Sequence, residues 1–302
     1  MQGWAMAAAM LCAVPTLAEE PELEPGTTAI CRVAQPADGD LKAFAARYFP
    51  AAGKTGIDGL IACLGDPHPA VRDEFAFALW SEGLRGKQLS PEWMRYTGQQ
   101  LSAILVQPDD AAGFRKPFAA LTLSEIARAD WIDPFLTAPE LHALAETAAS
   151  YLRDVRDYRG FFADEGWRHG VAHGADLLMQ LALNPRLARA DADLLLGAIA
   201  AQVAPVASPL YVHGEARRLA RPLLFLAKRA DIDDAAWAAW FQTLHPDAAV
   251  RWQTPYASAA GLAAVHNSSA FGDAVYVAAS ESQDPQVRRL VPLAAGLLKA
   301  LP

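Results

Sequence analysis

The stretch LGDPHPAVRDEFAFAL, residues 64–79, decides the fold, because its layout returns twice near the C-terminus. It consists of a turn built on Asp-Pro, a Val-Arg pair and an apolar segment suited to a helix. The same layout occurs in LHPDAAVRWQTPYASAAGL (244–262) and in ESQDPQVRRLVPLAAGLL (281–298). The proline ends one helix, the aspartate starts the next, and the valine is expected to pack inward while the arginine reaches carboxylates or carbonyls along the stack. Three matching turns indicate a helical repeat.

The spacing of the turns fits a repeat of two helices. Val250 and Val287 are 37 residues apart, and Val71 and Val250 are separated by 179 residues, close to five such periods. The chain between them is expected to hold degenerate hairpins, such as FRKPFAALTLSEIARAD (114–130) and EARRLARPLLFLAKRAD (215–231). Because the segments resemble HEAT-type repeats, we expect an all-α fold without a sheet, a HEAT-like α-solenoid of stacked antiparallel helical hairpins. The alternative is an α/α toroid, which pairs its helices in the same way but joins its ends.

Capping residues mark several helix starts. Ser90 precedes Pro-Glu, an arrangement that provides an N-cap, a proline in the first turn and an acid at the positive end of the helix dipole. Thr137 and Glu140 have the spacing of a capping box, and Asp40 can start the helix that follows it.

Composition favours a large helical core and argues against several partners. Of the 302 residues 53% are hydrophobic, Ala and Leu dominate, and β-branched residues are sparse. The net charge is −8 and no run of Lys and Arg occurs. Binding to nucleic acid or to an anionic membrane surface needs a basic patch, so we expect a protein or a small ligand as the partner and no nucleic acid.

The first residues have the features of an export signal. Residues 1–18, MQGWAMAAAMLCAVPTLA, form an uncharged apolar run that ends in a small-x-small cleavage site and is too short for a comfortable membrane span. The acidic, proline-rich segment 19–38 is expected to be flexible, and residues 39–302 are expected to form a single all-helical HEAT-like domain. We therefore expect a periplasmic or secreted protein of bacterial type, with no stable membrane insertion after signal cleavage.

Cleavage of the signal would leave two cysteines, Cys31 and Cys63. In an oxidising compartment such a pair predicts a disulfide, which would tie the N-terminal segment to the first helical unit. The alternative is two buried free thiols. Their spacing does not suit a metal site.

The stretch GWRHGVAHGADLL, residues 166–178, carries the most conspicuous polar pattern. If it is helical, His169, His173 and Asp176 project from one strip of the surface, about 60° wide. Gly170 and Gly174 flank this strip, and two glycines four apart in a helix indicate close approach by a neighbour. The helix is expected to be buried on most sides, with its polar edge turned toward a partner helix or a cavity.

One hypothesis is a divalent metal site. Two imidazoles four apart on a helix and the Asp176 carboxylate are a suitable ligand set for zinc, with a water in the fourth position. The metal would lower the pKa of that water to about 7 for hydrolysis. Asp157 or Glu215 could support the ligands or act as a general base, and His213 could add a third imidazole.

The other hypothesis is structural. Asp157, Arg159, Glu215 and Arg218 are candidates for buried ion pairs. The two histidines would form hydrogen bonds across an interhelical gap, and Asp176 would cap a loop amide or pair with an arginine. Such a network fixes the register of neighbouring repeats. The loop around Arg159 and Gly160 carries the aromatic residues Tyr158 and Phe161, and it could line the same cavity or serve as a docking point for a partner.

Three segments taken together resemble a known family. DPHPAVRDEFAFALW (66–80), YLRDVRDYRGFFADEGWRHGVAHGADLLMQLA (151–182) and GEARRLA (214–220) are similar to the bacterial domain-of-unknown-function family 2785. The resemblance implies an all-helical, HEAT-like fold and names no reaction. Its motif residues fall on Asp157, Arg159, Gly160, Gly166, Trp167, His169, His173, Gly174, Ala175, Asp176, Glu215, Arg218 and Leu219.

This sequence departs from the family pattern in two places. FRKPFAALTL (114–123) replaces a segment that is richer in hydroxyl groups, and Ala216 and Arg217 stand where acids are usual. Two functions remain open: an interaction or ligand-binding scaffold with a central polar pocket, and a metal-dependent hydrolase-type enzyme that uses His169, His173 and Asp176.

Overall fold

The computed structural model describes residue 31 and residues 40–206, 209–247 and 249–302. This part of the chain is all-α except for one short hairpin. The first elements are α1 (Leu41–Cys63), the π-helix η2 (Ala70–Phe77), α2 (Ala78–Arg85), α3 (Pro91–Leu105), α4 (Arg115–Ile132), α5 (Ala138–Asp154), β1 (Phe161–Phe162) and β2 (Gly166–Trp167). The others are α6 (Gly170–Ala182), α7 (Arg189–Val203), α8 (Glu215–Leu226), α9 (Asp234–Gln242), α10 (Val250–Gln253), the 3₁₀ helix η3 (Pro255–Ala257), α11 (Ala259–Glu281), α12 (Pro285–Arg288) and α13 (Val291–Ala300). The signal peptide expected at 1–18, and all of the segment 19–38 except Cys31, lie outside the described residues.

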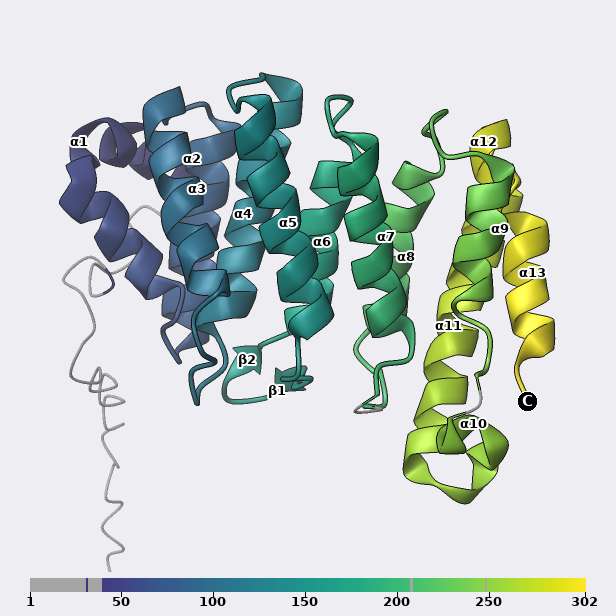
Figure 1. Ribbon diagram of the computed structural model, residues 1–302. Helices are drawn as coiled ribbons and strands as arrows, with labels where there is room; N and C mark the ends of the chain where they lie inside the picture. The colour runs from purple at the N-terminus through teal and green to yellow at the C-terminus, as the bar shows by residue number, and fades with distance from the viewer. Residues whose placement is uncertain (1–30, 32–39, 207–208, 248) are drawn as a thin grey trace, which may run out of the picture.

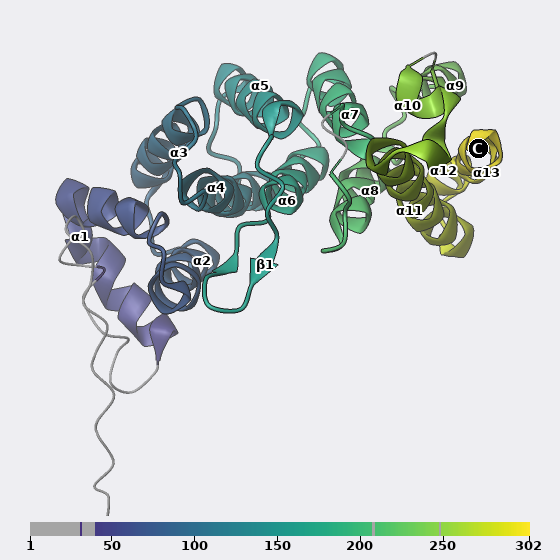
Figure 2. The ribbon, with the colours of Figure 1, turned by 90° about the horizontal axis from the view of Figure 1, so that it is seen from below.

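The helices form two layers along a curved row (Figures 1 and 2). In the inner layer α4 contacts α6, α6 contacts α8, α8 contacts α11 and α11 contacts α13. In the outer layer α3 contacts α5 and α5 contacts α7. Figure 2 shows the inner layer on the hollow side of the row, with α1 at one end and α13 at the other.

The three sequence repeats fold into the same local turn. The carboxylates of Asp66, Asp247 and Asp284 each accept a hydrogen bond from the backbone N–H two residues later, at 2.9, 2.8 and 2.9 Å. This contact is the Asx turn, which lets an aspartate replace a backbone acceptor where the chain reverses. The three segments therefore share the geometry of this turn as well as its sequence pattern.

The Val-Arg pairs of the repeats also lie close to where the sequence predicts them. Arg72, Arg251 and Arg288 each donate to at least one backbone carbonyl oxygen. Val287 is buried, and Val71 is half-buried against the core. The arginines thus satisfy carbonyl groups that the turns leave without a helical partner.

Two of the helical segments are interrupted. Helix α1 is broken at Gly53, where φ is +53°, a conformation that a helix cannot contain and that glycine adopts readily. Within 244–262 the expected single helix is divided into α10, η3 and α11, and Pro255 opens η3. A proline disfavours the helical conformation in the residue before it, which accounts for the break after α10.

The predicted helix caps are confirmed. Asp40 accepts from the N–H of Ala43 at 2.9 Å, and Ser90 accepts from the N–H of Trp93 at 3.3 Å. Thr137 forms the complete capping box: its hydroxyl accepts from the N–H of Glu140, whose carboxylate accepts from the N–H of Thr137. Each cap stabilises its helix by about 1 kcal/mol.

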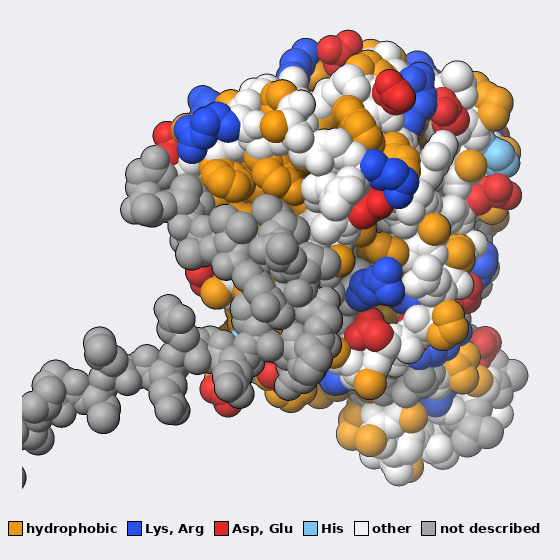
Figure 3. Space-filling view, turned by 90° about the vertical axis from the view of Figure 1, so that its left-hand side faces the viewer, with side chains coloured by type: hydrophobic (Ala, Val, Ile, Leu, Met, Phe, Trp, Pro, Cys, Tyr) orange, Lys and Arg blue, Asp and Glu red, His pale blue; other side chains and the backbone are white. Residues whose placement is uncertain are grey.

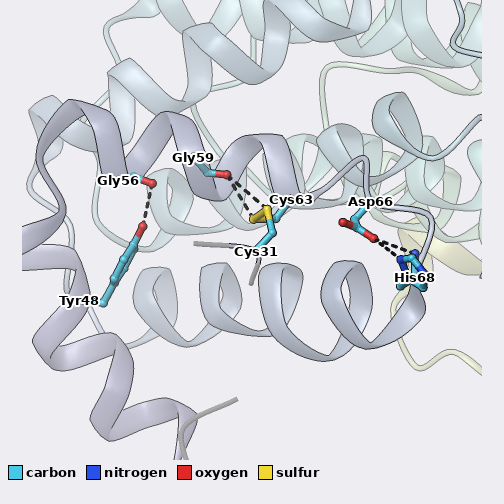
Figure 4. The surroundings of a disulfide bond; sticks show 7 residues. All are labelled: Cys31, Tyr48, Gly56, Gly59, Cys63, Asp66 and His68. Carbon is cyan, nitrogen blue, oxygen red and sulfur yellow. Dashed lines mark hydrogen bonds and ion pairs between the residues drawn. A yellow bond between two sulfur atoms is a disulfide. The ribbon is translucent and has the colours of Figure 1, made fainter. Parts of the chain in front are cut away.

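The predicted disulfide between Cys31 and Cys63 is present, with the Cα atoms 5.5 Å apart (Figure 4). It fastens Cys31 against the last turn of α1, where both cysteines are buried. A bridge that closes a loop of this length contributes about 3 kcal/mol or more, mainly by restricting the unfolded chain.

On the part of the molecule's end that is uncovered in Figure 3, Lys and Arg side chains are interspersed with Asp and Glu. Among the described helices, none is long and apolar enough to span a bilayer.

Candidate functional site

The segment 166–169 does not belong to the helix that the sequence predicts over 166–178. Trp167 lies in β2, which pairs antiparallel with β1, and His169 occupies the left-handed region with φ +59° just before α6. The expectation of a fold without a sheet is therefore wrong at this point. Gly166, at φ +74°, supplies a turn conformation that a helix cannot contain, and the N–H of Arg168 donates to the carbonyl of Gly160 at 3.0 Å.

The histidines of this segment form a ring cluster with Trp167. His169 stacks on Trp167 at a centroid distance of 4.6 Å, and its ring lies 5.8 Å from that of His173 and 6.5 Å from that of His213. His213 in turn contacts the edge of Trp167 at 5.6 Å. The structure thus brings together all three imidazoles that the sequence singles out.

Both histidines of the motif use a ring nitrogen as a hydrogen-bond donor. His173 Nδ1 donates to the carbonyl of Pro117 at 3.2 Å, and its ring meets Phe118 edge-on at 5.2 Å. His169 Nε2 donates to the carbonyl of His213 at 3.0 Å. Because a carbonyl oxygen can only accept, these contacts fix which nitrogen carries the proton.

Burial keeps these two imidazoles neutral. It lowers the pKa of His169 to about 4 and that of His173 to about 3, and the charge of Arg218 acts in the same direction. An imidazolium placed here would lose its hydration without gaining a carboxylate partner. The rings are therefore uncharged over the physiological pH range.

Asp176 faces a different partner. Its carboxylate is ion-paired with Arg218 and lies 4.0 Å from the guanidinium of Arg221. Burial raises the pKa of Asp176 although Arg218 opposes the shift. Among the described residues, no group of three His, Cys, Asp or Glu side chains has an arrangement suited to hold a metal ion.

Asp157 and Arg159 form a pair of their own. Arg159 Nε donates to Asp157 Oδ1 at 2.8 Å and Nη2 donates to Oδ2 at 2.5 Å, while the backbone N–H of Arg159 donates to Oδ1 at 3.1 Å. Burial alone would raise the pKa of Asp157, but these contacts outweigh it and lower the pKa. The pair lies against Gly113, where a Cβ atom would come within 2.3 Å of the carboxylate.

Glu215 orients His213. Its carboxylate is buried at the start of α8 and accepts from the backbone N–H of His213 at 2.9 Å. The ring of His213 packs directly on Gly160, where a Cβ atom would come within 1.9 Å of it. A glycine is required at position 160 for this close approach.

The two glycines of the helix also have the predicted neighbour. A Cβ atom at Gly174 would lie 3.1 Å from both Tyr151 and Leu152, and one at Gly170 would lie 3.4 Å from the hydroxyl of Tyr151. Helix α5 therefore packs closely along this side of α6.

Two buried arginines were not identified as site residues from the sequence. Arg72 and Arg168 place their guanidinium groups 3.9 Å and 4.2 Å from the ring centre of Phe114. Arg72 also donates to the carbonyl of Glu165 at 2.9 Å, and Arg168 donates to that of Ala112 at 2.6 Å. Both arginines thus tie the β1–β2 hairpin to the helical layers. The repeat pattern predicts that Arg72 reaches a carbonyl or carboxylate, whereas no pattern in the neighbouring sequence predicts the contacts of Arg168.

The centre of this cluster is closed. The crevice lined by Tyr158, Arg159, His169 and Glu215 has no volume open to a water-sized molecule. Open space lies to either side of it. One cavity of about 320 Å³ lies beside Tyr151 and Lys116, and a groove of about 800 Å³ runs between α8 and α11.

The hairpin itself presents aromatic side chains to the solvent. Phe161 and Phe162 are each 47% exposed, and Trp167 is 39% exposed. Phe161 and Trp167 lie side by side with ring centres 5.1 Å apart. In Figure 2 the hairpin that carries these residues projects from the inner layer next to α2 and α6, on the hollow side of the row.

Comparisons with known proteins agree with the resemblance noted in the sequence. No curated protein and no solved structure matches the chain. A family model described as "Protein of unknown function (DUF2785)" matches residues 101–277, a span that contains the ring cluster, the hairpin and α8. The chain belongs to the DUF2785 family.

Proposed function

We propose that this protein is a helical-repeat scaffold that binds a partner protein through the β1–β2 hairpin. The observation that carries the proposal is the exposure of Phe161, Phe162 and Trp167 on a hairpin that is held from several sides. Aromatic side chains presented on a rigid support are the usual anchors of protein interfaces.

The buried cluster supports the hairpin. Trp167 stacks on His169, Arg168 reaches Ala112, and Arg72 reaches Glu165 in the turn between the strands. These contacts limit the side-chain and backbone freedom that binding would otherwise have to remove. On this view the conspicuous polar residues of the sequence have a structural role, and the neighbouring aromatics make the contact.

The alternative, a metal-dependent hydrolase-type enzyme, requires His169, His173 and Asp176 to converge on one ion such as zinc. His169 and His173 each donate to a carbonyl, and Asp176 is ion-paired with Arg218. The crevice beside His169 has no room for a metal-bound water. The scaffold is the better account of this geometry.

We further propose that residues 39–302 form one HEAT-like solenoid rather than a toroid, and that the chain is exported with residues 1–18 as its signal. The continuous buried core and the separation of α1 from α13 support the open arrangement (Figure 2). The disulfide fits an oxidising compartment.

The test is site-specific photo-crosslinking in the cell that makes the protein. A photoreactive residue at Phe162 should give a discrete crosslinked species, and the same residue at Val106 should give none. Val106 is the control because it is 74% exposed and lies at the end of α3, outside the hairpin. Crosslinking of equal intensity at both positions, or at neither, would contradict the proposal.

A Phe161→Ser/Phe162→Ser double variant completes the experiment. The crosslink, now placed at Trp167, should disappear while the melting temperature changes little, since both side chains are about half exposed in the native state. The purified protein should also be analysed for metals. Stoichiometric zinc that is lost in a His169→Ala/His173→Ala variant would favour the enzyme.

A further inference from the structure

The groove between α8 and α11 is the largest of the described cavities, at about 800 Å³, and it has a clear physical origin. Its lining includes Ala216 and Ala220 from α8 and Ala270 and Ala274 from α11. Side chains this small cannot fill the angle between two packed helices, so the surface stays hollow. The volume lies within the range of about 300–1,000 Å³ that is typical of ligand clefts.

The groove carries charges on both walls. Arg217 and Arg221 stand four residues apart on α8 and both are exposed, while Asp273 is exposed on α11. Within the described part of the chain, Arg217 and Asp273 form no hydrogen bond or ion pair, and the nearest acid to Arg221 is Asp176 at 4.0 Å. Two like charges at this helical spacing repel each other by a few tenths of a kcal/mol, and the contact with Asp176 offsets this repulsion for Arg221 alone.

The apolar surface of the groove continues toward the hairpin. Val277 on α11 is 57% exposed, and Val212 just before α8 is 64% exposed, and both line the groove. The residue after Val212 is His213, whose ring contacts Trp167 at 5.6 Å. One partner could therefore touch the groove and the aromatic hairpin together.

We infer that the α8–α11 groove binds an acidic amphipathic helix of the partner protein, an inference that rests on the proposed scaffold function. The apolar side of that helix packs on the alanine floor, and its carboxylates pair with Arg217 and Arg221. A basic residue further along the helix meets Asp273. A helix laid into a groove between two helices is a common mode of peptide recognition, and the charges select among candidate helices.

The charge pattern favours this occupant over a lipid or a second copy. A phosphate surface would need more cations than two arginines, and Asp273 would repel it. The chain has a net charge of −8, yet this groove presents the exposed guanidinium groups of Arg217 and Arg221 to an incoming ligand. An acidic segment of a protein needs only a few cations to pair with, and a basic residue on the same segment can meet Asp273.

The experiment uses the full mature chain and a synthetic probe. The probe is a fluorescein-labelled amphipathic peptide of about 18 residues with Leu at helical spacing and Glu on the flanks of the apolar stripe. A second peptide carries Lys in place of every Glu. Fluorescence anisotropy should show that the acidic peptide binds and the basic one does not, with affinity falling as salt is added.

Two variants test the site. Arg217→Glu/Arg221→Glu should weaken binding of the acidic peptide at least about tenfold and improve binding of the basic one. Ala274→Trp should fill the groove and abolish binding of the acidic peptide. The matched control is Lys42→Glu/Arg47→Glu, which reverses two exposed charges on α1 and should leave the affinity unchanged.

The outcomes separate this inference from the scaffold proposal. If Arg217→Glu/Arg221→Glu binds the acidic peptide as well as the wild type does, the groove assignment is wrong, whereas crosslinking at Phe162 still tests the hairpin. Binding to anionic vesicles instead of the peptide, or a dimer that Ala274→Trp dissociates, would overturn it by identifying another occupant.

Discussion

Two junctions in the inner layer each join a pair of packed helices, α4 with α6 and α8 with α11. Side chains fill the first junction, whereas the second is open at the surface. At the first, Phe118 and His173 fill the interface, and the hairpin covers it with Trp167. At the second, alanines face one another and the junction stays open as a groove of about 800 Å³. In this molecule the conspicuous polar residues of the sequence therefore lie at the filled junction, whereas small residues and exposed charges line the open one.

The largest expected effect comes from removing the charge that supports the filled junction. Arg72→Met should cost about 3–5 kcal/mol in the free energy of unfolding, because the side chain is fully buried and its loss leaves Asp73 and the carbonyls of Asp66 and Glu165 without their donor. Urea denaturation followed by circular dichroism measures this loss. Arg288→Met, at the equivalent place in the third repeat, is the control and should cost less than about 1 kcal/mol because that side chain is exposed. Similar losses of unfolding free energy in both variants would show that the buried arginine of the first repeat contributes no more than the exposed arginine of the third.

The two neutral imidazoles of the filled junction should make the protein less stable in acid. Their folded pKa values are about 4 for His169 and about 3 for His173, below the unfolded value of 6.5, so the unfolded chain binds more protons between these limits. The contribution of the two neutral rings to the free energy of unfolding is therefore fully present above pH 6.5 and is lost as the pH falls. The expected loss is about 1 kcal/mol per pH unit for each histidine, or about 2 kcal/mol between pH 6 and pH 5. Urea titrations at the two pH values measure it.

A His169→Gln/His173→Gln variant should be less stable but should lose this part of the acid sensitivity. His142 is the control because its pKa is raised by its hydrogen bond to Asp191, so its contribution has the opposite sign and is lost as pH rises through its folded pKa. His142→Gln should therefore leave the acid loss in place. A wild-type free energy of unfolding that is equal at pH 6 and pH 5 would show that these rings are not held neutral.

The smallest effects come from adding the same side chain to the two junctions. Ala175→Leu on α6 should destabilise the protein by about 1–3 kcal/mol, because Ala175 is completely buried and the extra volume has no space. Ala274→Leu on α11 should change stability by less than about 0.5 kcal/mol, because Ala274 lines the open groove. Thermal melts of both variants give the comparison. Equal destabilisation would mean that the groove is not open in solution.

Much of the local structure could be predicted from the sequence. The caps at Ser90 and Thr137 and the shared turn at Asp66, Asp247 and Asp284 depend on contacts within a few residues, which a sequence pattern records directly. The pairing of Cys31 with Cys63 followed from having two cysteines left after the expected cleavage. The segment 166–169 was assigned wrongly, because its spacing of polar residues continues the helical pattern although the chain there pairs with β1.

The candidate site was predicted only in part. The sequence identified His169, His173 and His213, and they do lie together. It left Asp176 either as a metal ligand or as the partner of a loop amide or an arginine, and in the structure Asp176 pairs with Arg218. It gave no indication that Arg72 and Arg168 would stack on Phe114, because those residues come from three separate elements.

By itself, then, the sequence determined that this chain is all-α, where many of its helices begin, how its repeated turns close and which family it belongs to. Each of these depends on the order of residues over short spans. Only the tertiary structure decided that the histidine cluster is closed, that the hairpin exposes its aromatics and that α8 and α11 leave a groove between them. Whether a junction is filled or open depends on the volumes of side chains from distant segments that meet there, and neighbouring residues in the sequence do not specify that volume.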